Sequence, residues 1–277
     1  MKISLKIGLF YFNLLMALAA YGNVPVLAGT KVVTVDERQL EVFVRRVEHA
    51  PYTVVFESGA RNCIQRWEKV LQQLPNDVNV YAYNRPGYCN SSPSAKARNS
   101  KNVVDELRVA LKQEGLKPPF ILIGHSIGGL YVQHFAREFP EEVHGVVLVD
   151  AMYPGFMKSQ AEFPWYTKLG MFMFLNKTVH GEISLAHASG LMIDALPAMD
   201  DKPVVRMFNE PKGAQGKAIA VDFGMFNRDE AAMSKVRSMY PRAKIVLADS
   251  SHQMQETSPD LIVQAIQDVM RATGPFQ

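Results

Sequence analysis

The sequence has little net charge, only two cysteines, and no internal repeat or low-complexity tract. Its 277 residues carry a formal net charge of +3. So small a charge gives no basic stripe, and we expect no binding of nucleic acid. Without repeats or biased tracts, a solenoid or a disordered tail is not expected. What is present is hydrophobic material, 48% of the residues, which is enough for one large core.

The sequence also lacks an apolar run of the roughly 20 residues that a membrane span needs. The apolar run at residues 7–20 is shorter and is interrupted by Asn13. It follows Lys2 and Lys6 and ends among alanines and a glycine. A basic start, a short apolar centre and a small-residue end are typical of a secretory signal. We therefore predict a signal peptide in residues 1–22.

Cleavage of this signal would leave a folded domain of residues 23–277 in the periplasm or outside the cell. It would remove two lysines and no acids, so the net charge would fall from +3 to +1. The alternative is that the segment is not cleaved. Residues 7–21 would then anchor the protein and bring it into contact with a membrane.

After the signal, strand and helix patterns alternate. Continuous β-branched runs are typical of buried central strands, and apolar residues at i, i+3, i+4 and i+7 indicate helices. Strands are expected at 39–47, 52–57, 78–83, 120–124, 143–150, 203–208 and 243–248. Helices are expected from about 64, at 103–112, 127–139 and 229–239, and after Ser258, which could cap the last one. This alternation predicts an α/β fold with a mostly parallel sheet and helices on both faces.

Residues 152–200 interrupt the alternation and are rich in methionine and aromatic residues. We interpret them as a helical cap inserted after the sixth main strand. Within the cap, the consecutive side chains at 171–174 are Met, Phe, Met and Phe. Such adaptable apolar side chains could contact an apolar substrate group, or they could form the core of the cap itself.

A Gly-x-Ser-x-Gly turn lies inside "ILIGHSIGGL", residues 121–130. The predicted strand 120–124 precedes Ser126, and an apolar helical pattern follows it. A nucleophile on so sharp a strand-to-helix turn stands clear of the sheet, and the crowded turn needs glycines beside it. The alternative is a glycine-rich turn with a serine that takes no part in chemistry. The strand–turn–helix context favours Ser126 as a nucleophile.

Four stretches together resemble the α/β-hydrolase fold family, in its serine esterase- and lipase-like branch. They are "GHSIGG" (124–129), "FESGARNCIQRW" (56–67), "YNRPGYCNS" (83–91) and "DSSHQMQETSPDLIVQAI" (249–266). The resemblance covers roughly residues 30–275. It departs from the family pattern twice in the second loop, where Asn84 replaces an aspartate and Cys89 replaces a glycine.

A serine hydroxyl needs a base, and the sequence offers seven histidines. His252 follows the last strand, on the face where parallel sheets bind ligands, and the resemblance places the family's base there. His125 adjoins the serine, and we expect it to support the turn. For the oxyanion hole the resemblance implies the amide of Ile127 and one from the loop after residue 57. Ala60 is our choice for the second donor and Arg61 the alternative.

The acid that orients the base is the least determined member. The family usually places it after the seventh strand, where the sequence has Glu210 and, later, Asp222 but no adjacent aspartate. A minority of the family uses the end of the sixth strand, where Asp150 lies. We predict Asp150, because an acid that orients the base must be held by a rigid element. Glu210 and Asp222 remain the alternatives, and Asp150 could also simply bind loop amides.

These residues imply hydrolysis of an ester-type bond in a small or apolar substrate, through an acyl-serine intermediate and without a metal or organic cofactor. An acyltransferase would use the same acyl-serine. A third reading is a non-catalytic binding protein that keeps the hydrolase fold, although such proteins usually lose a triad member. The sequence gives no indication of the oligomeric state.

The two cysteines, Cys63 and Cys89, can form only one disulfide. Each lies in a loop at the carboxyl end of a predicted strand, and export would place them where disulfides persist. The resemblance implies that these two strands lie on either side of the nucleophile strand and that their loops fold toward one cleft. We predict a Cys63–Cys89 disulfide that tethers the loop containing Ala60. The alternative is two buried thiols.

Overall fold

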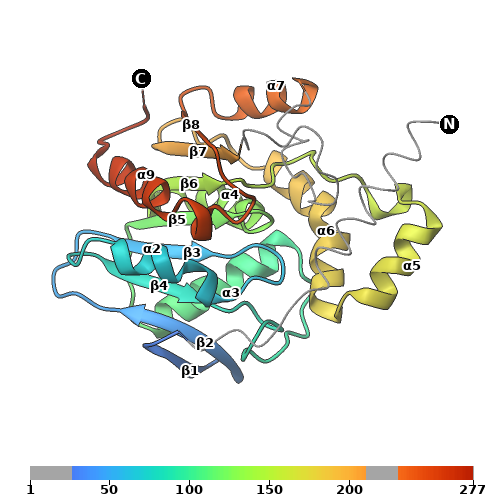
Figure 1. Ribbon diagram of the computed structural model, residues 1–277, viewed down its shortest axis with the longest axis horizontal. Coiled ribbons are helices and arrows are strands. Elements are labelled where there is room, and N and C mark those ends of the chain that lie inside the picture. Colours follow the sequence, from blue (N-terminus) through green and yellow to red (C-terminus); the bar gives the residue numbers. More distant parts are fainter. Residues whose placement is uncertain (1–26, 210–229, 277) are drawn as a thin grey trace.

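The computed structural model describes residues 27–209 and 230–276. The predicted signal peptide, residues 1–22, lies outside this range, as do Glu210 and Asp222. The described residues form an eight-stranded sheet in the order β1-β2-β4-β3-β5-β6-β7-β8 (Figure 1). Its strands are β1 (Thr30–Val35), β2 (Arg38–Arg45), β3 (Thr53–Glu57), β4 (Asn79–Tyr83), β5 (Phe120–His125), β6 (Val143–Val149), β7 (Val204–Asn209) and β8 (Lys244–Ala248).

Strands β4, β3, β5, β6, β7 and β8 are parallel, and β2 pairs antiparallel with β4 at one edge. The sequence patterns did not predict β1, which pairs antiparallel with β2 beyond it. Five of its six residues are not buried, so it lacks the apolar signal of a core strand. Two left-handed residues, Asp36 and Glu37, make the tight turn that joins β1 to β2.

Helices cover both faces of the sheet, because its inner strands are apolar on both sides. In β5, Leu122 packs into the cluster beneath α3, α4 and α7, while Ile121 and Ile123 pack into the cluster beneath α2 and α9. The helices of the two layers are α3 (Ser100–Gln113), α4 (Gly128–Glu138) and α7 (Glu230–Met239) on one face, and α2 (Glu68–Gln73), α8 (Met254–Thr257) and α9 (Pro259–Arg271) on the other.

Two short 3-10 helices accompany these layers: η1 (Ile64–Trp67) leads into α2, and η2 (Pro140–Glu142) leads into β6. Ser258 precedes α9 as expected, but its side chain makes no capping hydrogen bond. Its backbone instead closes α8, since the Ser258 amide donates to the Met254 carbonyl at 2.8 Å. Among the helices of the described residues, none has the length and apolar character needed to cross a bilayer.

The segment between β6 and β7 forms a cap at one end of the sheet (Figure 1). It holds η3 (Gln160–Glu162), α5 (Trp165–Phe174) and α6 (Lys177–Asp194). One apolar cluster joins the cap to the start of α4, with Ile127 and Leu130 on one side and Phe163, Met171 and Val179 on the other. The expected fold class, including a helical cap after the sixth strand, is confirmed.

The apolar run at residues 171–174, whose role the sequence left open, lies partly in the interior of the cap and partly on its surface. Met171 is buried in the shared cluster, whereas Phe172, Met173 and Phe174 are exposed. A helix turns by 100° per residue, so four consecutive side chains cannot all face one core. The run as a whole is therefore not the core of the cap.

Candidate active site

Ser126 lies on a strained turn between β5 and α4. Its φ of 53° is in the left-handed region, which is unusual for a serine. Its carbonyl accepts hydrogen bonds from the amides of Gly129 at 2.9 Å and Met152 at 2.8 Å, so the strained conformation is held from both sides. The side chain is nearly buried.

Two glycines beside Ser126 are required by close packing. A Cβ at Gly128 would lie 2.5 Å from the carbonyl oxygen of Glu57, at the end of β3. A Cβ at Gly124 would lie 2.4 Å from Cγ2 of Val132, one turn along α4. Gly124 lets α4 pack against β5, the strand it follows, and Gly128 lets the helix begin against the end of β3. The spacing of the motif thus has a steric cause in this chain.

His252 and Asp150 are brought together from positions 102 residues apart in the chain. His252 lies in the loop after β8 (residues 249–253, the β8 loop), and Asp150 immediately follows β6. The Nδ1 atom of His252 lies 2.6 Å from Oδ2 of Asp150. An aspartate hydrogen-bonded to Nδ1 fixes the tautomer in which Nε2 can accept a proton.

Asp150 is buried and held by its neighbours. It has a left-handed φ of 40°. Its amide donates to the Met207 carbonyl at 2.9 Å, and its carboxylate accepts hydrogen bonds from the backbone and side-chain amides of Asn209. Asn209 is the last residue of β7, so a rigid strand end orients the carboxylate. The alternative acids, Glu210 and Asp222, lie outside the described residues.

His125 supports the β8 loop from the elbow. Its Nε2 lies 2.8 Å from the carbonyl oxygen of His252, so this nitrogen carries the proton and donates it. Burial, and then the neighbouring His252, lower the pKa of His125 well below its usual range. The ring is therefore neutral near pH 7. The sequence predicted support of the turn, and the structure gives His125 a second contact, with the loop that carries His252.

Asn62 connects three segments that the sequence could not place together. It lies in the loop after β3 (residues 58–63, the β3 loop). Its Nδ2 donates to Nδ1 of His125 and to Oε1 of Gln253 in the β8 loop, both at 3.1 Å. Asn62, Gln253 and Asn209 are site residues that sequence reasoning missed. Only Asn209 gave a signal in the sequence, because it is a polar residue at the end of a buried strand.

The two residues whose backbone amides are expected to bind an oxyanion, Ile127 and Ala60, lie at the same apolar cluster. Ile127 belongs to the apolar cluster between cap and sheet, and Ala60 packs against that cluster. Within residues 27–209 and 230–276, neither amide donates a hydrogen bond to a protein group. Two backbone donors without a protein acceptor are what an anion site requires. Arg61, the alternative donor, has a left-handed φ of 58°.

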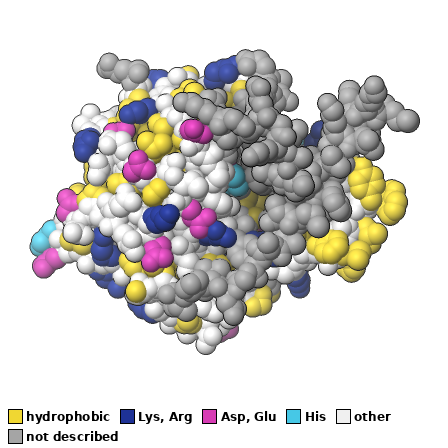
Figure 2. All heavy atoms as spheres, viewed as in Figure 1, with side chains coloured by type: hydrophobic (Ala, Val, Ile, Leu, Met, Phe, Trp, Pro, Cys, Tyr) yellow, Lys and Arg dark blue, Asp and Glu magenta, His cyan; other side chains and the backbone are white. Residues whose placement is uncertain are grey.

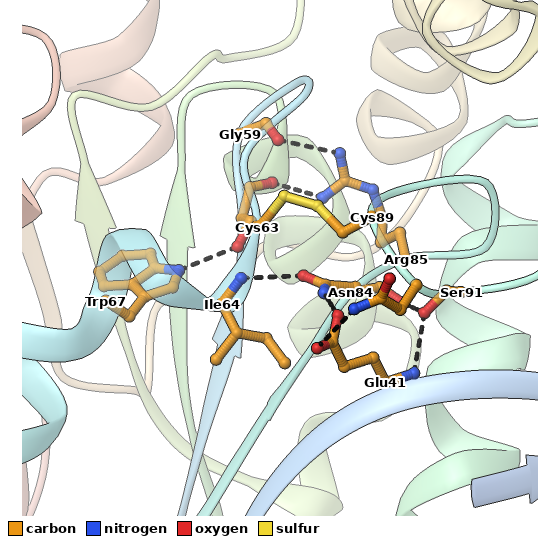
Figure 3. The surroundings of a disulfide bond; sticks show 11 residues. Glu41, Gly59, Cys63, Ile64, Trp67, Asn84, Arg85, Cys89 and Ser91 are labelled. Atoms are coloured by element: carbon orange, nitrogen blue, oxygen red, sulfur yellow. Dashed lines mark hydrogen bonds between the residues drawn. A yellow bond between two sulfur atoms is a disulfide. The ribbon is translucent and has the colours of Figure 1, made fainter. Parts of the chain in front are cut away.

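The predicted disulfide between Cys63 and Cys89 is present, with a Cα–Cα distance of 6.3 Å (Figure 3). It joins the β3 loop to the loop after β4 (residues 84–91, the β4 loop). The two strands are neighbours on the same side of β5, and not on either side of it as expected. Adjacent parallel strands bring their following loops together, so the pairing has a direct geometric cause.

The two departures from the family pattern, Asn84 and Cys89, both bond to residues 63–64, where the β3 loop ends. Cys89 has a left-handed φ of 48°, a conformation that a glycine adopts without strain, and here the disulfide holds it. Asn84 accepts a hydrogen bond from the amide of Ile64 at 2.8 Å and donates to the carboxylate of Glu41 (Figure 3). An aspartate could not donate to Glu41 and would repel it. Asn84 therefore suits a site that already contains a buried carboxylate.

A buried ionic cluster lies next to the disulfide. Arg85 of the β4 loop contacts Glu57 at 2.6 Å and Glu182 of α6 at 2.8 Å and 2.9 Å, with all three side chains almost fully buried. Arg85 also donates to the carbonyls of Ser58 and Gly59 in the β3 loop (Figure 3). Burial, opposed by Arg85, raises the pKa of Glu57. One guanidinium thus ties the cap helix, the end of β3 and the β3 loop together.

The described residues contain no group of three His, Cys, Asp or Glu side chains arranged to hold a metal ion. The polar groups of the candidate site are His252, Asp150 and the backbone amides of Ile127 and Ala60. These can transfer a proton and stabilise a developing negative charge.

Residues 52–175 match the family model described as alpha/beta hydrolase fold. Uncharacterized protein YqjL of Bacillus subtilis is 24% identical over 230 residues, which are 78% of this chain and 83% of that protein. The match therefore extends over most of both proteins, and the relative's name assigns no activity.

Solved structures of an epoxide hydrolase and a thioesterase domain have the same fold. The epoxide hydrolase CorEH superposes with a TM-score of 0.64 at 13% identity, covering 87% of this chain and 98% of that one. The thioesterase domain from the curacin biosynthetic pathway gives 0.59 at 14% identity, covering 86% and 98%. The match over residues 52–175 and these structures show that the chain has the α/β-hydrolase fold. A fold of this kind supports several activities, so the reaction and the substrate must be argued from the site.

Proposed function

We propose that the protein is a serine hydrolase that cleaves an ester-type acyl bond, with Ser126, His252 and Asp150 as the catalytic residues. The observation that carries the proposal is the 2.6 Å contact between His252 Nδ1 and Asp150. It leaves Nε2 as the proton acceptor, in a loop held against the strained Ser126 turn by His125. A serine, a buried carboxylate and a histidine, in this order along the chain, are the triad that this fold uses for acyl transfer.

In the proposed reaction, Ser126 Oγ attacks the acyl carbon while His252 Nε2 takes the hydroxyl proton. Asp150 stabilises the imidazolium that forms. The carbonyl oxygen becomes an oxyanion, and the Ile127 and Ala60 amides donate to it. His252 then gives its proton to the leaving alcohol. Water attacks the acyl-serine by the same steps, which releases the acid and restores Ser126.

The nucleophile separates this proposal from another chemistry on the same fold. Epoxide hydrolases and dehalogenases of this fold attack with a carboxylate, whereas this elbow carries a serine with a hydroxyl. A thioesterase domain is among the structural neighbours, and thioesters are acyl compounds that an acyl-serine route also cleaves. The apolar cluster around Ile127 favours a substrate with an apolar acyl or alcohol group.

We also propose that the protein is exported. The Cys63–Cys89 disulfide supports this, because disulfides persist in oxidising compartments and are rare in the cytosol. The signal pattern of residues 1–22 supports it from the sequence. Edman or mass-spectrometric analysis of the N-terminus of protein from the exported fraction tests both points.

The test of the reaction is labelling with a fluorophosphonate probe, followed by hydrolysis of p-nitrophenyl esters of increasing acyl length. We expect the probe to modify Ser126, as identified by peptide mass spectrometry, and Ser126→Ala to abolish both labelling and turnover. Ser238→Ala, on the exposed face of α7, is the matched control and should leave both unchanged. Ester hydrolysis by Ser126→Ala within about tenfold of the wild type would overturn the proposal.

The competing functions give different results in the same assay. An acyltransferase labels with the probe but forms mainly a new ester when an alcohol acceptor is added. A non-catalytic binding protein neither labels nor turns over. Failure to label Ser126 in folded wild-type protein therefore favours the binding-protein reading.

A further inference from the structure

Helix α5 presents an exposed apolar face at the outer end of the cap. Trp165 is 74% exposed, Phe172 79% and Met173 63%. Leu169 and Tyr166 are also exposed on this helix, and only Thr167 and Met171 are buried. Figure 2 shows apolar side chains gathered at the end of the molecule where Figure 1 places α5. We call these five residues, Trp165, Tyr166, Leu169, Phe172 and Met173, the α5 face.

The five side chains form one continuous surface. At 100° per residue, Phe172, Trp165 and Leu169 lie within about 60° of each other around the helix, and Met173 and Tyr166 extend the same arc. The rings of Trp165 and Tyr166 lie edge to face, with centroids 6.0 Å apart. The buried residues Thr167 and Met171 lie on the opposite side. Most of the large apolar side chains of α5 therefore face outward, whereas an ordinary surface helix turns its apolar side to the core.

Three of the four charged residues in and next to α5 in the sequence are lysines. Lys168, at the edge of the arc, is the charged residue of α5, and Lys158 and Lys177 lie before and after the helix in the sequence. Within the described residues, none of these three lysines forms an ion pair with a carboxylate. Glu162 is the nearest acid in sequence, and it caps η3 through the amide of Ser159. An apolar face with basic residues at its margin suits an apolar surface that carries negative charge.

We propose that the α5 face binds the surface of an anionic lipid bilayer, with its helix lying in the plane of the interface. Tryptophan and tyrosine favour this position because each has an apolar ring and a polar group that stays hydrated. Phenylalanine, methionine and leucine enter the acyl region, and the lysines meet the lipid headgroups. The proposal concerns a surface on the cap and does not depend on the reaction at Ser126.

Lipid explains the face better than a second copy of this chain does. A dimer would place the lysines of two α5 faces close to one another, where like charges repel. A bilayer with anionic headgroups pairs with them instead. The helix has ten residues, which is enough to lie in an interface and too few to cross a bilayer.

The chain provides its own probe, because it has two tryptophans and the structure separates them. Trp67 is 1% exposed and donates to Ser58, whereas Trp165 projects from the α5 face. We would mix the full-length protein with vesicles of phosphatidylcholine alone or with phosphatidylglycerol. On the anionic vesicles we expect a shift of the emission to shorter wavelength and quenching by lipids brominated in the acyl chain. Both changes should be absent in Trp165→Phe.

Variants identify the binding surface. Phe172→Ser with Met173→Ser should lower vesicle affinity at least about tenfold, because two apolar contacts with the acyl region are lost. Val109→Ser with Leu247→Ser is the matched control, since these exposed apolar residues lie on α3 and β8. The control should bind as the wild type does. Lys168→Gln should weaken binding to anionic vesicles by about fivefold and leave binding to phosphatidylcholine unchanged.

Three results would overturn the proposal. Equal vesicle binding by the wild type and the Phe172→Ser, Met173→Ser variant would mean that another segment, such as residues 7–20, binds the lipid. Unquenched Trp165 emission in the presence of brominated lipid would mean that α5 does not enter the bilayer. A lipid-free dimer that shields Trp165 from acrylamide, detected by sedimentation, would assign the face to a second copy.

Discussion

The β3 loop and the β8 loop flank the Ser126 turn, and they are held in different ways. The β3 loop is joined covalently to the β4 loop by the disulfide, and Arg85 binds two of its carbonyls. The β8 loop donates a hydrogen bond to Asp150 and accepts hydrogen bonds from His125 and Asn62. One loop is fixed by a cross-link and a buried ion, and the other by polar side chains.

The difference follows from what each loop contributes to the proposed reaction. The β3 loop would offer a backbone amide, which has no side-chain torsion to adjust and can be aimed only by fixing the loop itself. The β8 loop offers an imidazole, whose ring is aimed by the partner of its second nitrogen. Changes in the β8 loop should therefore affect catalysis more than stability, and changes around the β3 loop should affect both.

The largest expected effect is on the β8 side. Asp150→Asn should lower kcat by about 10³–10⁴-fold, because an amide in place of the carboxylate favours the wrong tautomer of His252 and cannot stabilise its cation. The melting temperature should change little by comparison. Ester turnover together with thermal unfolding monitored by circular dichroism separates the two quantities.

Glu210→Gln and Asp222→Asn are the controls for Asp150→Asn, since these carboxylates were the alternatives in the sequence. Each should keep kcat within about tenfold of the wild type. If Glu210→Gln proves more damaging than Asp150→Asn, the acid belongs to the seventh strand and the assignment of Asp150 is wrong.

The second effect concerns the ion cluster behind the β3 loop. Arg85→Met should destabilise the protein by about 3–5 kcal/mol, because it leaves Glu57 and Glu182 buried without their cation. Glu57→Gln is the matched variant. It keeps an acceptor for Arg85 and removes one of two like charges, so its cost should be about 1 kcal/mol. Urea unfolding measures both, and equal costs would contradict the role given to Arg85.

The third effect tests the covalent link. Cys63→Ser with Cys89→Ser opens a loop with a sequence separation of 26 and should cost about 3–4 kcal/mol through the unfolded chain. It should also lower kcat more than KM rises, if the disulfide aims the Ala60 amide. Reduction of the wild type with dithiothreitol should reproduce both changes. A stability loss with kcat unchanged would limit the disulfide to a structural role.

The elements that the sequence predicted best are those with a strong local signal. The Ser126 turn could be predicted because its glycines are required by contacts within a few residues and at the adjacent strand end. The disulfide could be predicted because two cysteines allow one pair. The fold class followed from the alternation of strands and helices, which reflects the two covered faces of the sheet.

What the sequence could not predict depends on contacts between distant segments. Asn62 is an ordinary loop asparagine until the fold brings it to His125 and Gln253, 63 and 191 residues away. The exposure of α5 was hidden for another reason. An apolar helix normally faces a core, so its pattern does not reveal which side is outward. Asp150 and Glu210 could not be separated by pattern, because each directly follows a strand.

The last effect is the smallest and concerns His125. Its ring contacts the β8 loop at His252 and the β3 loop at Asn62. Its pKa is lowered by burial, so between that value and the ordinary value of about 6.5 the unfolded chain binds more protons than the folded one. The stabilisation from a neutral His125 is therefore fully present above about pH 6.5 and declines as the pH falls below it. The free energy of unfolding of the wild type, minus that of His125→Gln, should fall by up to about 1.4 kcal/mol per pH unit in that range. Urea unfolding at pH 5, 6, 7 and 8 measures this difference, with His49→Gln, whose side chain is 91% exposed, as the control. A difference that stays constant from pH 8 to pH 5 would mean that His125 is not held neutral between the two loops.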